Sequence, residues 1–285
     1  MTNTSFRTRT APAFLFAATL LGALGVGAAI RPDANAAPAP APVVAQAVPG
    51  TMALAALPAS LPAVTEVDQE RVLTAESLMT EDSQLDRLAA LAPELDRDVL
   101  ELALEARREA VRRGDATRSE LLTVIDYSLP STEKRLWVFD TRAEELLFHE
   151  LVAHGKNTGD NLARSFSNRE NSLQTSLGTF VTADTYQGGN GYSLRLKGLD
   201  RGYNDNALSR YIVMHGAPYV SEAVARQQGR IGRSWGCPAL SQTVAPQVID
   251  TIKGGSVIFS YYPDNDWLAS SSLLAGVSGA VRAAR

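Results

Sequence analysis

Cysteine and histidine are scarce in this chain of 285 residues, which has one cysteine, Cys237, and three histidines. A single cysteine cannot close a disulfide within the chain. The sequence also has no Cys-x-x-Cys, no His-Glu-x-x-His and no pair of metal ligands at helical spacing. A zinc site would have to combine Cys237 with His215 and either His149 or His154, which is poor ligand spacing. We therefore expect no metal and no other cofactor.

Basic tracts with interleaved aromatic residues are also absent, and the formal net charge is −4. A mildly acidic chain binds nucleic acid poorly, so we expect no nucleic-acid partner. The length is that of one or at most two domains, with enough residues for a buried core.

The N-terminus has the features of an export signal. Arg7 and Arg9 precede an apolar run at residues 11–30, and the small residues Ala34-Asn35-Ala36 follow it. This order is typical of a cleavable signal peptide, here residues 1–36. If it stayed uncleaved, the apolar run would tether the protein to a membrane. Export to the periplasm or cell envelope would expose an unpaired thiol to oxidising conditions, so the thiol needs a reason to be there.

Composition divides the remaining chain into four parts. Residues 37–66 hold six of the fourteen prolines and almost no charge, which is typical of a disordered linker. Residues 67–119 have helical periodicity, and we expect this helical segment to pack on the domain that follows. Residues 120–262 form the predicted main domain, and residues 263–285 are rich in serine and alanine, which predicts a flexible tail.

The helical pattern is clearest in residues 93–110, where apolar residues starting at Leu95 recur every three or four positions. Pro93 suits the first turn of this helix, and Gly114 suits its end. A second helix is expected at residues 244–252.

From residue 121 onward, short β-branched or aromatic segments alternate with turn residues, as in a sheet-rich domain. We expect residues 141–145 to close a hairpin and residues 188–191 to form a turn between strands. The fold class predicted is mainly β, a β-rich α+β domain. The expected strands are residues 122–127, 135–140, 146–153, 178–182, 193–199, 211–215 and 256–262.

Cys237 lies in a turn framed by Gly236 and Pro238 that is expected to run into a helix, and His215 precedes it by 22 residues at the expected end of a strand. Cysteine with histidine is the minimal pair for acyl transfer, because the imidazole can take the thiol proton before sulfur attacks a carbonyl. Backbone N–H groups in such a turn would stabilise a thiolate and later an oxyanion. The alternative is a buried, inert thiol. Arg233, close to the thiol, would suit a substrate that bears a carboxylate.

Two strings carry a family resemblance: Met-His-Gly (214–216) and Gly-Arg-Ser-Trp-Gly-Cys-Pro-Ala-Leu (232–240). They resemble the murein L,D-transpeptidase catalytic domain, the YkuD-like family, whose signature is a strand-end histidine followed by a Ser-x-Gly-Cys loop. The resemblance is strongest to the branch with Ser-Trp-Gly-Cys-Pro-Ala-Leu. It implies a mixed β-sheet or sandwich catalytic domain with a few helices, preceded by an N-terminal helical segment. Further matching strings lie at residues 128–138, 154–159, 193–200 and 252–256.

The resemblance also implies chemistry on peptidoglycan stem peptides. Cys237 would attack the carbonyl of the third, diamino-acid residue of a tetrapeptide and expel the terminal D-alanine. An amine from another stem would then resolve the thioester into a 3→3 cross-link. By position, His215 would be the base and the Gly216 carbonyl would orient it, while N–H groups around Gly236 and Cys237 would form the oxyanion hole.

The chain departs from the better-known members at two places. Trp235 replaces a histidine, and Pro238-Ala239-Leu240 follows the cysteine where those members place an arginine or asparagine. The resemblance therefore implies a more aromatic pocket, in which Arg233, Ser234 and Trp235 contact the substrate.

Two other hypotheses stay open at this point. An L,D-carboxypeptidase or hydrolase would resolve the same acyl-enzyme with water, and a non-catalytic wall-binding module would retain the fold without needing the thiol. We expect the protein to be a monomer.

Overall fold

Two strongly apolar strands form the centre of the sheet. The computed structural model describes residues 81–276. In it, β1 (Leu121–Asp126) and β8 (Val257–Tyr261) pair in parallel, and every residue of both strands is buried. Strands that are buried on both faces read as nearly continuous apolar runs, which explains the sequences LLTVID and VIFSY.

Eight strands form one sheet in the order β3-β2-β1-β8-β4-β5-β6-β7. The β1/β8 and β6/β7 pairs are parallel, and the other neighbours are antiparallel. The remaining strands are β2 (Leu136–Asp140), β3 (Glu145–Glu150), β4 (Gly178–Gly188), β5 (Gly191–Gly198), β6 (Val213–Ala217) and β7 (Ala239–Ser241).

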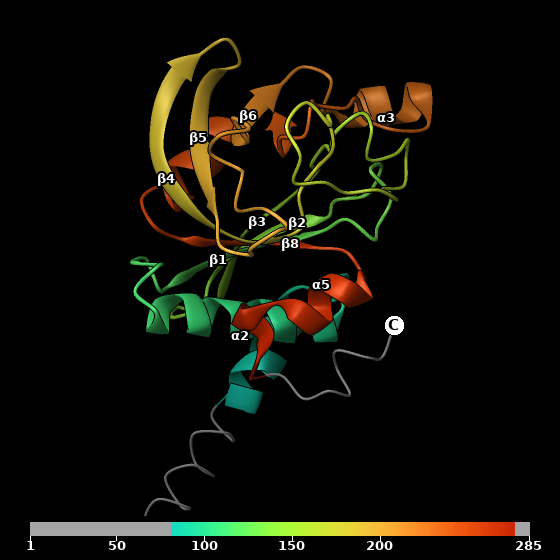
Figure 1. Cartoon of the computed structure of the whole chain (residues 1–285). Helices are drawn as coiled ribbons and strands as arrows, with labels where there is room; N and C mark the ends of the chain where they lie inside the picture. Colours follow the sequence, from blue (N-terminus) through green and yellow to red (C-terminus); the bar gives the residue numbers. More distant parts are fainter. Residues whose placement is uncertain (1–80, 277–285) are drawn as a thin grey trace, which may run out of the picture. The chain divides into compact units, whose positions relative to one another are not determined.

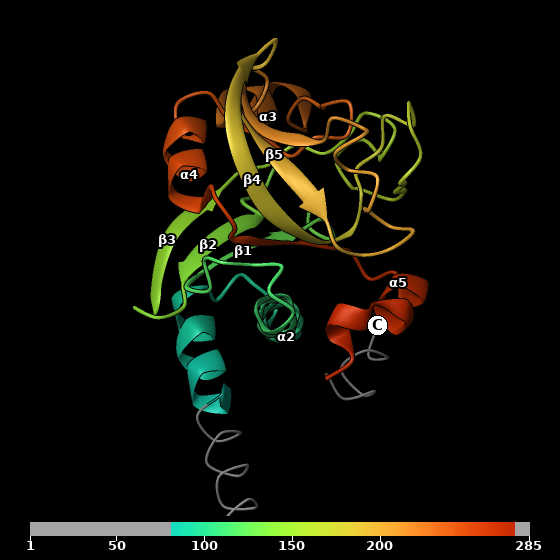
Figure 2. The same cartoon turned by 60° about the vertical axis from the view of Figure 1, so that its left-hand side comes forward.

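Helices cover the sheet from both sides. Residues 81–91 are helical, and α2 (Arg97–Arg112) packs its apolar face against β1, β2 and β8. On the opposite side, α4 (Ala245–Ile252) packs on a second core with β5 and β6, and Figure 2 shows α2 and α4 separated by the sheet. Among residues 81–276, no helix has the length and apolar character to cross a bilayer.

The predicted fold class is confirmed, because one sheet of eight strands is accompanied by a few helices. Each of the seven predicted strands is present, and both predicted turns, 141–145 and 188–191, join antiparallel neighbours. Between residues 121 and 262, the structure adds the short strand β7 and the helix α3 (Glu222–Gln228), which were not predicted.

The start of α2 differs from the prediction. Pro93 lies in a turn, and the helix begins at Arg97 because the Asp96 carboxylate accepts a hydrogen bond from the Asp98 N–H at 2.8 Å. An aspartate in this position satisfies one of the free N–H groups at a helix N-terminus. Gly114 has φ +76°, a left-handed conformation that glycine adopts without steric cost, which fits its predicted place at the end of the helix.

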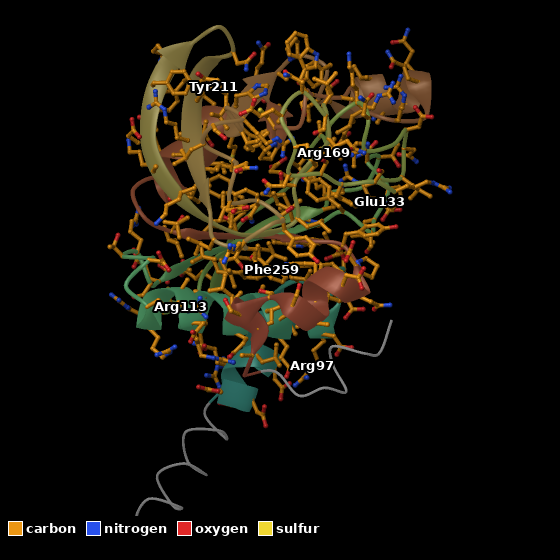
Figure 3. The ribbon with its side chains drawn as sticks, viewed as in Figure 1. Arg97, Arg113, Glu133, Arg169, Tyr211 and Phe259 are labelled. Carbon is orange, nitrogen blue, oxygen red and sulfur yellow. The ribbon has the colours of Figure 1, made fainter. Side chains whose placement is uncertain are left out.

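The prediction of a flexible tail from residue 263 is wrong for the described residues up to 276. Helix α5 (Asn265–Ser270) and the 3-10 turn η1 (Ser272–Leu274) follow β8 and lie beside α2, as Figure 1 shows. Trp267 is fully buried, with its ring centroid 5.5 Å from that of Phe259, and Figure 3 places Phe259 between the sheet and the two helices. Serine and alanine dominate the tail, but its few large apolar residues are spaced to reach the core.

Several predicted segments lie outside the described residues. These are the signal peptide at 1–36, the linker at 37–66, the first part of the helical segment at 67–80, and residues 277–285 of the tail.

Removing the buried indole should destabilise the domain. We expect Trp267→Ala to lower the free energy of unfolding by about 3–5 kcal/mol, because it deletes a large side chain from a packed core. Urea denaturation measures this. The matched control is Asn265→Ala, at an exposed position of the same helix, which should change stability by less than about 0.5 kcal/mol. Equal stability of the two variants would show that α5 does not pack on the domain in solution.

Candidate active site

Strands β6 and β7 bring His215 and Cys237 close together. His215 lies in the middle of β6 and pairs with Ser193 of β5 on one side and with Ala239 of β7 on the other. Cys237 stands just before β7, and both side chains line one pocket of about 480 Å³. The structure therefore brings together the two residues that the sequence singled out.

Two details of their surroundings differ from the prediction. β6 does not end at His215, because parallel pairing with β7 extends it to Ala217. The turn after Cys237 leads through Pro238 into β7, and the next helix begins only at Ala245. The N–H groups near the thiol therefore belong to a loop and a strand.

A neighbouring carbonyl orients the imidazole of His215. Its Nδ1 lies 3.0 Å from the Gly216 carbonyl oxygen. Since a carbonyl only accepts hydrogen bonds, we assign the proton to Nδ1, which leaves Nε2 with a free lone pair. Burial lowers the pKa of His215, and the hydrogen bond to Gly216 opposes this shift. His215 is thus a neutral proton acceptor at neutral pH.

The thiol of Cys237 is largely buried, with 9% of the residue exposed. The Val213 N–H donates to Sγ at 3.5 Å, and Sγ lies 3.6 Å from the Tyr211 carbonyl oxygen, to which the thiol donates. Burial raises the pKa of Cys237, while the Val213 N–H, the Arg210 charge and the N–H of Cys237 itself act to lower it. The resting residue is a thiol whose surroundings can stabilise a thiolate.

The loop that carries Cys237 is fixed by Ser234. The Ser234 hydroxyl donates to the Cys237 carbonyl oxygen at 2.6 Å and accepts from the Gly236 N–H at 3.1 Å. Gly236 has φ +128°, and a Cβ there would lie 2.7 Å from the Gln174 carbonyl oxygen, so the position requires glycine. Because the Gly236 N–H is engaged, the Cys237 N–H is the better placed oxyanion donor.

Ser234 also stands at the centre of a Gly-x-Ser-x-Gly string, residues 232–236, which in other enzymes marks a serine nucleophile. Here its hydroxyl is buried and holds the loop backbone at both ends. No helix follows the string directly, so it lacks the strand-turn-helix context of a nucleophile elbow.

Two exposed aromatic side chains flank the pocket. Trp235 is 74% exposed and Tyr211 is 82% exposed, although both line the pocket that contains Cys237. The Nζ of Lys156 lies 5.9 Å from the centroid of the Trp235 ring, within cation–π range. The aromatic character expected of the pocket from Trp235 is thus present in the structure.

Arg233 lines the same pocket, but part of its guanidinium is already used. Its Nη1 donates to Asp160 at 2.7 Å, to the Gly159 carbonyl at 2.9 Å and to the Lys156 carbonyl at 3.2 Å. Arg233 therefore holds the segment 156–160 against the loop that carries Cys237. These contacts limit how freely the guanidinium can turn toward a substrate carboxylate.

The other two histidines do not line the pocket. His149 stacks on Trp137 with centroids 4.9 Å apart. His154 is buried, its Nδ1 faces Arg135 Nη2 at 2.8 Å, and burial together with the Arg135 charge lowers its pKa to about 4. Within residues 81–276, histidine, cysteine and carboxylate side chains nowhere gather in a group that could hold a metal ion.

Sequence reasoning missed seven residues that also line the pocket: Asn171, Leu173, Asn190, Arg210, Tyr211, Ile212 and Tyr219. They come from irregular segments, where no periodic pattern marks a side chain as inward-facing. The one usable signal was the position of Arg210 and Tyr211 shortly before His215 in the same string.

Fold and pocket together define a β-rich domain that sets a histidine and a single cysteine beside one cavity. A family model described as the L,D-transpeptidase catalytic domain matches residues 91–261, and the chain belongs to this family. The match begins ahead of α2, so it includes the helix that packs beneath the sheet. No curated protein matches the sequence.

Solved structures with partial similarity include three bacterial proteins. An L,D-transpeptidase from Mycobacterium smegmatis is 18% identical, with 50% of this chain and 59% of that chain covered and a TM-score of 0.32. The helical cell shape determining protein Pgp2 from Campylobacter jejuni is 12% identical, with 54% and 53% covered and a TM-score of 0.32. An L,D-transpeptidase from Stackebrandtia nassauensis is 13% identical, with 63% and 90% covered and a TM-score of 0.31. The chain thus spans little more than half the length of the first two.

The resting protonation states can be tested through the single thiol. We expect the rate of alkylation of Cys237 by iodoacetamide to rise through a midpoint above that of an ordinary cysteine, because burial raises its pKa. The midpoint should move little in His215→Ala, since a neutral imidazole adds no charge. Mass spectrometry follows the adduct. A plateau of high reactivity already below neutral pH would instead reveal a thiolate–imidazolium pair at rest.

Proposed function

We propose that this protein is an exported cysteine acyltransferase that acts on peptidoglycan stem peptides and forms 3→3 cross-links by L,D-transpeptidation. The observation that carries the proposal is the shared pocket, in which a neutral histidine of β6 lies beside the only cysteine of the chain, just before the adjacent strand β7. Membership of the L,D-transpeptidase catalytic domain family supports the substrate class.

In the first half of the proposed reaction, Cys237 is acylated. Nε2 of His215 takes the thiol proton, and sulfur attacks the carbonyl of the third residue of a tetrapeptide. We assign the Cys237 N–H, which already favours the thiolate, as the donor that stabilises the oxyanion that forms. The bond to the terminal D-alanine breaks, the imidazolium gives its proton to the leaving amine, and a thioester remains.

In the second half, an amine of another stem peptide attacks the thioester. His215 accepts the amine proton, and the tetrahedral intermediate collapses to a new peptide bond and a thiolate, which the imidazolium reprotonates. The low pKa of His215 suits this role, because the ring returns to its neutral form after each transfer.

The residues around the pocket have separate roles in the proposal. Trp235 offers an exposed aromatic surface to the substrate, and Arg233 supplies positive charge at the rim. Ser234 acts on the loop backbone, so we assign it the role of fixing the catalytic loop in place of a direct substrate contact.

Export is proposed from the sequence of residues 1–36 alone. N-terminal sequencing of the protein recovered from its native host should begin near residue 37, and an intact Met1 would contradict cleavage.

The reaction can be tested with purified tetrapeptide-rich peptidoglycan fragments and mass spectrometry. The wild-type protein should yield a cross-linked dimer together with free D-alanine, and Cys237→Ala should yield neither. His215→Ala should lose about 10²–10⁴-fold in rate, because it removes the general base. The control is His149→Ala, outside the pocket, which should keep wild-type activity.

The outcomes separate the related functions. Release of D-alanine without a dimer would replace transpeptidation with carboxypeptidation by the same acyl-enzyme. Absence of any product that depends on Cys237 would overturn both enzymatic functions and favour a wall-binding module.

The aromatic rim gives a second test. Trp235→Ala should raise KM roughly three- to tenfold and leave kcat almost unchanged, because an exposed ring away from the reacting atoms contributes equally to ground-state and transition-state binding. Trp235→Phe, which keeps an aromatic surface, should restore most of the affinity. Steady-state kinetics with a soluble stem peptide measures both constants. A fall in kcat at constant KM would place Trp235 at the reacting atoms.

A further inference from the structure

A loop without regular secondary structure, residues 167–176, forms one wall of the Cys237 pocket. Its ends are joined, since the Ser167 N–H donates to the Thr175 carbonyl at 3.0 Å. Two of its residues, Asn171 and Leu173, line the pocket, and both have left-handed backbone conformations with φ of 56° and 58°. Non-glycine residues keep such conformations only where their surroundings hold them.

Arg210 donates several of the hydrogen bonds that keep this loop in place. Its Nη1 donates to the Ser167 carbonyl at 2.6 Å and to the Ser176 hydroxyl, and its Nη2 donates to the Gln174 carbonyl at 2.7 Å and the Ser172 hydroxyl at 3.1 Å. These four bonds use every N–H of the two terminal nitrogens. One guanidinium thus fixes both ends and the middle of the loop.

The same contacts reach the nucleophile. The Gln174 carbonyl that accepts from Arg210 is the oxygen that packs against Gly236, 2.7 Å from where a Cβ would stand. The position of this loop therefore bears on the residue directly before Cys237.

The charge of Arg210 has no acidic partner nearby. Within residues 81–276, no carboxylate lies at salt-bridge distance from it, whereas the neighbouring Arg233 pairs with Asp160. The guanidinium also lines the pocket, and its positive charge favours the thiolate of Cys237. Because its terminal donors are already taken by the loop, Arg210 is better suited to position the pocket than to bind a substrate carboxylate.

We propose that Arg210 is a positioning residue of the acyl-transfer site, which fixes the 167–176 loop as a pocket wall through its planar fork of donors and favours the Cys237 thiolate through its charge. This inference rests on the proposed function, but its two parts can be separated from it. Fixing the loop requires the planar donor geometry of arginine, whereas favouring the thiolate requires only a positive charge.

The test compares Arg210→Ala, Arg210→Lys and Ser172→Ala in the full chain. The matched control is Arg201→Ala, an exposed arginine in the same β5–β6 connection. Three measurements apply: hydrogen exchange of peptides covering residues 167–176, the pH midpoint of Cys237 alkylation, and kcat and KM with soluble stem peptide. Thermal unfolding checks that each variant folds.

We expect Arg210→Ala to speed exchange in the loop, to move the alkylation midpoint to higher pH and to raise KM about tenfold or more, since charged hydrogen bonds are lost. Arg210→Lys should keep the wild-type midpoint but still speed exchange and raise KM. Ser172→Ala, which removes the hydroxyl that accepts from Arg210 and from the Gln174 N–H, should speed exchange without moving the midpoint. Arg201→Ala should match the wild type in all three.

Two results would overturn the proposal. In one, Arg210→Ala is less stable but keeps the wild-type rate of hydrogen exchange in the loop, the wild-type pH midpoint of Cys237 alkylation and the wild-type KM. Arg210 would then have a structural role only. In the other, Arg210→Lys restores all three quantities, which would show that a point charge suffices. If the wild-type protein forms no product through Cys237, the proposed function fails, while exchange and alkylation still decide whether Arg210 clamps the loop.

Discussion

The parallel pairing of β6 with β7 is the constraint on which the pocket depends. It aligns His215 with Ala239 and so holds the imidazole close to the cysteine two residues earlier. Parallel neighbours cannot be joined by a tight turn, so the chain must make a long excursion between them. That excursion, residues 218–238, contains α3 and ends in the loop with Trp235, which forms much of the pocket rim. The parallel pairing of β6 with β7 therefore requires the long connection that supplies Cys237 and much of the pocket.

Burial dominates the electrostatics of the pocket. It raises the pKa of Cys237 and lowers that of His215, so both groups rest in their neutral forms. Thiolates, not thiols, are the species that oxidants attack, and a neutral buried thiol resists oxidation better than an exposed one. For the proposed exported enzyme, whose chain has no second cysteine, the same burial that slows activation would also preserve Cys237 between turnovers.

Much of the fold could be predicted because its signals are local. The apolar runs of β1 and β8, the glycine-rich turn at 188–191 and the periodic face of α2 each identify their own element. Cys237 and His215 were identifiable because so few residues of their types exist. The rest depends on long-range contacts. β7 is only three residues long and is a strand solely because β6 lies beside it, and Arg210 acquires its role from a loop more than thirty residues earlier. Likewise, the burial of Trp267 is set by α2 and Phe259, which its own surroundings in the sequence do not reveal.

In the sequence, α2 precedes all the strands, and α5 and η1 follow them. In the structure, these two segments pack against each other. Arg113, at the end of α2, donates to the Ser272 carbonyl at 2.7 Å, and Figure 3 shows Arg113 and Phe259 on the side of the molecule where these helices lie. A fragment trimmed to the strands, residues 120–262, would lose both helices and leave the aromatic underside of β2 and β8 facing water. Such a surface favours self-association. The practical boundary of the folding unit therefore lies well outside the strands that hold the pocket.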